Sequence, residues 1–176
     1  EKYGELEFEA VLHATGRRAN TEGLGLENTD IELRPNGTIV VDEFCQTAVE
    51  NVFAVGDVNG GLQFTYVSLD DFRVVNGYLH GNKEYTTADR KNVPYSTFIS
   101  PALSHVGLHK EEAEAAYPNV AVASLPVANM PRGAVNQDPR GLFRVTVDKD
   151  TNLILGATLF GKNSEEIINL IKMAID

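Results

Sequence analysis

A single carboxylate, Asp57, directly follows a glycine at the end of an apolar run in TAVENVFAVGDVNGG (residues 47–61). Residues 51–57 are rich in β-branched and aromatic side chains and are bounded by turn residues, which predicts a short strand. A carboxylate at the carboxyl end of a strand lies where open α/β sheets bind their ligands. An ionised Asp in that place can accept hydrogen bonds from sugar-like hydroxyl groups.

A helix is expected to begin shortly after Asp57. Apolar residues recur with helical spacing between Phe64 and Leu79, and the predicted helix begins at Thr65. The backbone N–H groups and the positive dipole end of a helix N-terminus favour partial negative charge on a ligand. The carboxylate and the helix terminus together suit a ligand with hydroxyls and an electron-rich ring, as in a flavin. The alternative is that Asp57 only caps a turn, the commoner role of a lone Gly-Asp pair.

The composition restricts the classes of partner and site. The 176 residues include 15 Lys and Arg against 25 Asp and Glu, a formal net charge of −10. This balance disfavours nucleic acid and anionic membranes as partners, and no apolar run is long enough to span a bilayer. The N-terminal EKYGELEFEA has no signal-like pattern, so a cytoplasmic location is the default expectation. Cys45 is the only cysteine, which excludes an intrachain disulfide, a CxxC pair and a cysteine-rich zinc site.

Two regions of different character surround a polar, turn-rich segment at residues 80–94. The first combines the predicted helix with expected strands at 5–16, 37–42 and 51–57, an α/β pattern. The second has the α+β pattern of an antiparallel sheet with helices. Its expected strands are residues 95–100, 120–128, 141–148 and 153–161, and its expected helices are 110–117 and 163–176.

The two ends of the chain predict a fragment of a longer protein. The sequence begins without Met and stops inside an amphipathic helical pattern that has no C-terminal stop signal.

Two motifs carry a family resemblance. HATGRRAN (13–20), followed by TAVENVFAVGD (47–57), resembles the ATG and T-x-x-x-x-hhhh-GD motifs of the FAD-dependent pyridine nucleotide-disulfide oxidoreductases. The stretches from VPYSTFISPALSHVGL to the end are similar to the interface (dimerisation) domain of the same family. GGLQFTYVSLDD and DRKNVPYS look most like the branch of mercuric-reductase-like and reactive-chlorine-resistance flavoproteins.

The resemblance implies a domain division and a cofactor site. Residues 1–91 would be the C-terminal part of the FAD/NAD(P)-binding region, and 92–176 a dimerisation domain truncated at its C-terminus. Asp57 would bind the ribityl hydroxyls of FAD, Gly56 would belong to the same cofactor site, and Gly16 would lie close to the bound dinucleotide. Gln63, Phe64, Thr65 and Tyr66 would lie beside the pyrimidine edge of the isoalloxazine ring, where backbone N–H groups stabilise the reduced, anionic flavin.

The family's chemistry-bearing motifs have no counterpart in this chain. Its two Gly-rich fingerprints, its redox-active cysteine pair and its C-terminal His-Pro are missing, and Ala19 stands where the family usually has Pro. We therefore predict no catalytic residue and no metal ligand here. Cys45 is expected to be a structural thiol and Arg17 a solvated surface residue.

Two function classes remain open on the sequence. In the first, the longer protein is a flavoenzyme that passes hydride from NAD(P)H to FAD and then electrons to a disulfide, a metal ion or an oxidant. In the second, the isolated chain is a non-catalytic dimerisation module. The choice between NAD and NADP and the identity of the acceptor stay open, and we expect the purified chain to be colourless.

Overall fold

The computed structural model describes residues 7–176, which divide into two compact units. The first unit ends at Thr87 and the second begins at Ala88, inside the polar segment 80–94.

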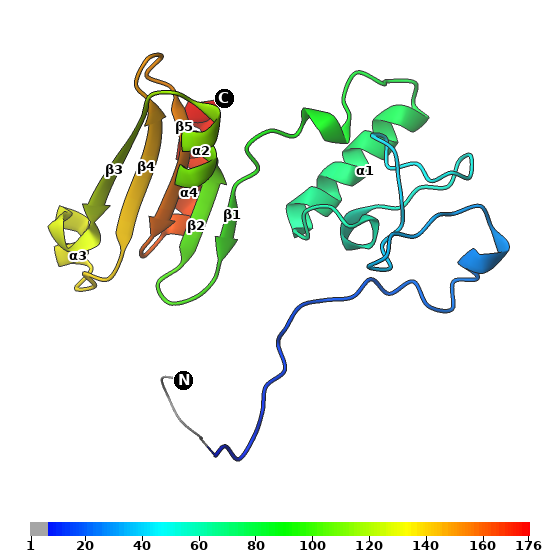
Figure 1. Ribbon diagram of the computed structural model, residues 1–176, viewed down its shortest axis with the longest axis horizontal. Helices are drawn as coiled ribbons and strands as arrows, with labels where there is room; N and C mark the ends of the chain where they lie inside the picture. The colour runs from blue at the N-terminus through cyan, green and yellow to red at the C-terminus, as the bar shows by residue number, and fades with distance from the viewer. Residues whose placement is uncertain (1–6) are drawn as a thin grey trace. The chain divides into compact units, whose positions relative to one another are not determined.

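Helix α1 (Thr65–Leu79) is the longest element of the first unit (Figure 1). Its bounds confirm the helix expected from the apolar spacing. Val67, Asp71 and Val74 are its buried residues and form one stripe along the helix. The rest of this unit consists of loops and short 3-10 turns. These turns are η1 (Leu26–Asn28), η2 (Gly56–Asn59) and η3 (Thr87–Asp89), the last of which crosses into the second unit.

The strands expected in the first region were wrong as regular elements. Residues 7–16 form no strand, and residues 5 and 6 lie outside the described part of the chain. Residues 37–42 and 51–57 make only single bridges, Leu33 to Ile39 and Gln46 to Phe53. A strand is stabilised by the hydrogen bonds of a neighbouring ladder, and single bridges supply too few to extend one.

The second unit is built on a five-stranded antiparallel sheet in the order β1-β2-β5-β4-β3 (Figure 1). This confirms the α+β arrangement. The strands are β1 (Tyr95–Thr97), β2 (Leu103–Gly107), β3 (Val120–Pro126), β4 (Leu142–Asp148) and β5 (Ile154–Phe160). The remaining elements are α2 (Lys110–Ala116), η4 (Val127–Asn129), α3 (Pro131–Val135) and α4 (Ser164–Ile175).

The core of the second unit lies between α4 and the central strands. Val106 of β2, Ala157 and Leu159 of β5 and Ile168 of α4 form one buried cluster. Ile168, Ile171 and Ile175 follow a helical spacing, so α4 presents one apolar face to the sheet. The start of α4 is fixed by Ser164, whose buried hydroxyl donates to the carbonyl of Ala102 at 2.9 Å.

Candidate functional site

Asp57 lies in a short 3-10 turn that follows an extended residue. Val55 has φ −120° and ψ 152°, and the turn η2 begins at Gly56. The turn ends against Gly60, which has φ 78° and a backbone N–H that donates to the carbonyl of Asp57. The Asp57 side chain is 46% exposed. The chain thus presents this carboxylate at the surface of the first unit.

The conformation and surroundings of Gly56 favour glycine. Its φ is 72°, and a Cβ there would lie 2.7 Å from Oγ of Ser68 in α1. A Cβ at position 56 would therefore require the Ser68 side chain to shift. This contact places Gly56 and Asp57 against the helix whose first turn was predicted to face the same ligand.

A buried carboxylate of α1 holds this turn from behind. Asp71, 1% exposed, accepts a hydrogen bond from the Gly56 N–H at 2.7 Å and another from Nδ2 of Asn59 at 3.0 Å. Sequence reasoning missed both Asp71 and Asn59. The available signal was an acidic residue on the buried stripe of α1, between Val67 and Val74.

The four other predicted flavin-facing residues lie at the N-terminus of α1. Phe64 is the N-cap residue, and its own side chain makes no capping hydrogen bond. The rings of Phe64 and Tyr66 stack with centroids 5.3 Å apart, and burial raises the pKa of the Tyr66 phenol. Gln63 and Thr65 are exposed. The start of α1 thus carries two stacked aromatic side chains, and its N-cap residue has no polar side chain.

Gly16 lies apart from this cluster, but its neighbour Arg17 contacts Asp57. Gly16 has φ 121°, and a Cβ there would meet no atom within 4 Å. Nη1 of Arg17 donates to Oδ2 of Asp57 at 3.1 Å, with Arg17 73% exposed. The solvated role expected for Arg17 was therefore incomplete, because its guanidinium pairs with the predicted ligand-binding carboxylate.

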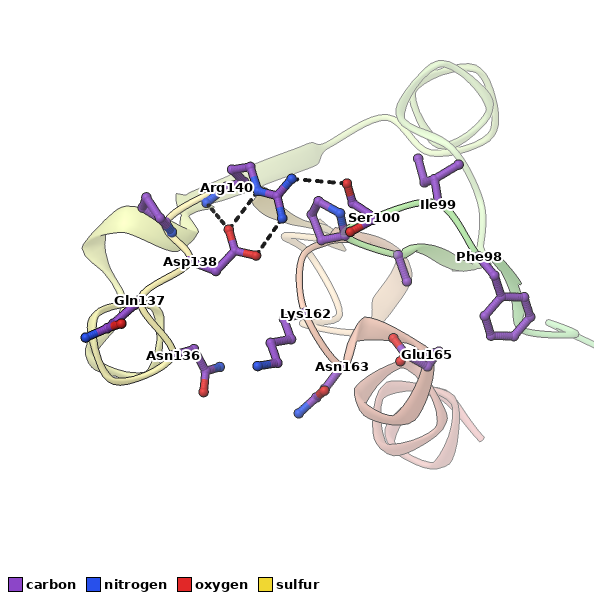
Figure 2. A pocket seen from close by; sticks show the side chains of 13 residues that line it. Phe98, Ile99, Ser100, Asn136, Gln137, Asp138, Arg140, Lys162, Asn163 and Glu165 are labelled. Atoms are coloured by element: carbon purple, nitrogen blue, oxygen red, sulfur yellow. Dashed lines mark hydrogen bonds and ion pairs between the residues drawn. The ribbon is translucent and has the colours of Figure 1, made fainter.

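The second unit contains a pocket of about 740 Å³ that sequence reasoning did not predict (Figure 2). Its walls come from the loop between β1 and β2, the loop between α3 and β4, and the start of α4. The pocket is lined by residues 98–102 and 136–140 and by Lys162, Asn163 and Glu165. Arg140 joins two of these walls, since it donates to the Ser100 carbonyl at 3.3 Å and to Asp138 at 2.8 Å.

The charges of this pocket neutralise one another in part. Arg140 beside Asp138 lowers the pKa of that carboxyl to about 2, so the pair stays ionised at neutral pH. Among the described residues, Oε2 of Glu165 is buried without a hydrogen-bond partner. Lys162 and Glu165 add one charge of each sign to the lining. The lining therefore contains two acidic and two basic side chains.

A stacked histidine pair lies at the sheet of the second unit. The rings of His105 and His109 have centroids 3.7 Å apart and an interplanar angle of 15°. Nε2 of His105 donates to the Gly107 carbonyl at 2.9 Å, so in the neutral ring Nδ1 accepts from the Thr158 hydroxyl at 2.8 Å. Burial and the neighbouring His109 lower the pKa of His105. The buried His105 ring, with its two hydrogen bonds and the stacked His109 ring, is part of the packing of the sheet.

The described residues contain neither a metal-ligand cluster nor a membrane-spanning helix. Within residues 7–176, no group of three or more His, Cys, Asp and Glu side chains is arranged to hold a metal ion. Over the same residues, no helix combines the length and apolar character needed to cross a membrane. Cys45, the lone cysteine, is fully buried.

Both parts of the chain match known proteins. Residues 1–71 match the family model described as pyridine nucleotide-disulphide oxidoreductase, and residues 93–176 match its dimerisation domain. The chain is 45% identical over 175 residues to the probable pyridine nucleotide-disulfide oxidoreductase RclA of Escherichia coli, covering 99% of this chain and 40% of RclA. It is 35% identical to a glutathione reductase of Burkholderia cepacia, covering 97% of this chain and 38% of that one.

A solved structure agrees with the sequence comparison. The HOCl-induced flavoprotein disulfide reductase RclA from E. coli superposes with a TM-score of 0.88 at 46% identity, covering 92% of this chain and 37% of that chain. The chain thus spans well under half the length of the relatives it matches. The two family models and these relatives agree with an α/β first part of the chain and an α+β second part. The chain belongs to the pyridine nucleotide-disulphide oxidoreductase family.

Proposed function

We propose that this chain supplies part of the FAD site and the dimerisation domain of an NAD(P)H oxidoreductase. The whole enzyme passes hydride from NAD(P)H to FAD and then electrons to a disulfide, a metal ion or an oxidant. Residues 1–91 belong to the cofactor-binding region and residues 92–176 form the interface between two copies. The observation that carries this proposal is the exposed Asp57 carboxylate, held by hydrogen bonds in a turn against helix α1.

Asp57 is suited to accept hydrogen bonds from the ribityl hydroxyls of FAD. Its current partner, Arg17, is bound through a surface ion pair in which the two side chains are 73% and 46% exposed. Exposed pairs of this kind contribute little free energy. Ligand hydroxyls can therefore replace Arg17 at Asp57 at small cost.

The first turn of α1 is suited to lie beside the ring system. Its partial positive charge favours electron density on a neighbouring group, and Phe64 supplies no competing polar cap. When bound, FAD supplies the ring that accepts hydride. Four residues at the helix start orient that ring, namely Gln63, Phe64, Thr65 and Tyr66. Gly16 allows close approach of the backbone to the dinucleotide.

A hybrid protein tests this proposal. Residues 1–176 replace the matching segment of E. coli RclA, which is 45% identical over 175 residues. We expect the hybrid to hold FAD through gel filtration. Asp57→Ala should lower FAD affinity at least about tenfold, because charge-assisted hydrogen bonds contribute roughly 1.5 to 3 kcal/mol each.

Asp30→Ala is the matched control, since Asp30 is another exposed carboxylate of the first unit. It should leave FAD affinity unchanged. A folded hybrid that takes up no FAD, or an Asp57→Ala hybrid with a full complement of FAD after dilution, would refute the proposal.

A second candidate function, self-association, is favoured by apolar surface on the second unit. Leu170 and Met173 of α4 are 65% and 76% exposed, and Phe98 and Ile99 are 82% and 54% exposed. Exposed apolar side chains grouped on one module commonly mark an interface. We propose a two-fold homodimer in which each subunit completes the active site of the other.

A further inference from the structure

The buried carboxylate of Asp71 needs an explanation that packing alone does not give. Asp71 lies on the inner stripe of α1 between Val67 and Val74 and is 1% exposed. A carboxylate in such a place destabilises the fold unless it is hydrogen-bonded. A leucine or alanine would fill this helix position without that cost.

Asp71 contacts both ends of the turn η2. Its Oδ2 accepts from the backbone N–H of Gly56 at 2.7 Å and from Nδ2 of Asn59 at 3.0 Å. Nδ2 of Asn59 also donates to the Ala54 carbonyl at 3.3 Å. Asp57 lies between these two anchored residues, so the direction of its side chain depends on them.

We propose that Asp71 is a positioning residue, which fixes the turn so that the Asp57 carboxylate and the N-terminus of α1 face one flavin together. This inference rests on the proposed FAD site. Asp71 belongs to the same helix as the predicted ring-facing residues, so its bonds to η2 join the two binding features into one rigid unit. The turn needs this anchor because Gly56, with φ 72°, has no side chain to restrict it.

The first test needs no cofactor. In the 176-residue chain, the amide of Gly56 is followed by NMR and hydrogen exchange in Asp71→Asn and Asp71→Leu. Loss of the hydrogen bond to a carboxyl oxygen should move the Gly56 amide proton upfield and speed its exchange, more in Asp71→Leu than in Asp71→Asn. Asp70→Asn is the matched control, because Asp70 lies on the same helix but accepts from the Tyr85 hydroxyl at 3.0 Å.

The second test separates positioning from general stability. FAD affinity is measured in the hybrid protein for Asp57→Ala, Asp71→Asn and the double variant. If Asp71 acts through Asp57, Asp71→Asn weakens FAD binding on its own, by about tenfold, and adds almost nothing once Asp57 is Ala. A merely structural role would give effects that add.

Each outcome has a defined meaning. An unchanged Gly56 amide in Asp71→Leu, an unchanged FAD affinity in Asp71→Asn, or additive effects would overturn the positioning role. If Asp57→Ala has no effect on FAD affinity while the Gly56 amide responds to Asp71, the flavin site itself is refuted and the role of Asp71 is reduced to holding the turn.

Discussion

At the scale of single residues, one ionisable group of interest is exposed and the other is buried. Asp57 stands exposed in its turn, with an arginine as its surface partner. His105 is 4% exposed and makes its hydrogen bonds to the neutral Thr158 and Gly107, with His109 stacked on its ring. The first group is available to a ligand, whereas the second is part of the packing.

His105 gives the chain a pH dependence whose sign follows from its pKa. Burial, with a smaller contribution from His109, lowers the pKa of His105 below its ordinary 6.5, while Gly107 and Glu112 oppose the shift. Below pH 6.5 and above the folded pKa, the unfolded chain binds more protons than the folded one. The free energy of unfolding should therefore rise with pH through this window and level off above it.

Urea unfolding is measured between pH 5 and pH 8 with a probe in the second unit. The dependence of the free energy of unfolding on pH checks this prediction. His105→Gln should reduce the slope of the free energy of unfolding against pH. A slope that falls with increasing pH, or one that is the same in His105→Gln, would show that His105 is not its source.

At the scale of elements, helix α4 stabilises the sheet through one face. Ile168 is 2% exposed and packs with Val106, Ala157 and Leu159, whereas Leu170 is 65% exposed. Ile168→Ala should lower the free energy of unfolding by about 3 kcal/mol, because it leaves a cavity in a packed core. Leu170→Ala, the matched control, should change it by less than about 1 kcal/mol in the monomer. Equal effects measured by chemical denaturation would contradict this placement of α4.

The elements of the second unit could be predicted from the sequence where local pattern decides them. The strands β3, β4 and β5 are apolar runs between turn residues, and α4 has a regular apolar face. Strand β2 was missed because its centre carries Ser104 and His105, whose burial depends on partners from other elements. Helix α3 has 5 residues, too few to show a period.

The candidate site shows the same limit. Asp57 and the start of α1 were predicted because a short motif marks both. Asp71 was not, because its importance depends on contacts with Gly56 and Asn59, which precede it by 15 and 12 residues. The strand expected before Asp57 failed because the described chain offers it one bridge at Phe53 and no ladder.

At the scale of the whole molecule, the match to a dimerisation domain leads us to expect that two copies of the protein associate. Leu170 and Met173 are exposed on α4, and we expect them to lie in the interface of a stable homodimer, which usually buries more than about 2,000 Å² in total. Sedimentation equilibrium of the hybrid protein at micromolar concentration should give a dimer. Leu170→Asp together with Met173→Asp should shift it toward monomer.

Leu24→Asp is the control, since Leu24 is 59% exposed in the first unit. It should leave the association constant unchanged. A strictly monomeric hybrid would rule out an active site completed by the partner subunit, and dimers unaffected by the α4 substitutions would place the interface elsewhere.

We propose that the turn at Asp57 and the first turn of α1 together bind one flavin. A crystal structure of the hybrid protein with bound FAD tests it most directly. We predict Asp57 carboxylate oxygens within hydrogen-bond distance of the ribityl hydroxyls, about 2.5 to 3.0 Å, the N-terminus of α1 beside the ring, and Arg17 displaced from Asp57. FAD bound with Asp57 still paired to Arg17 and no contact from its carboxylate to the ribityl chain would contradict the account.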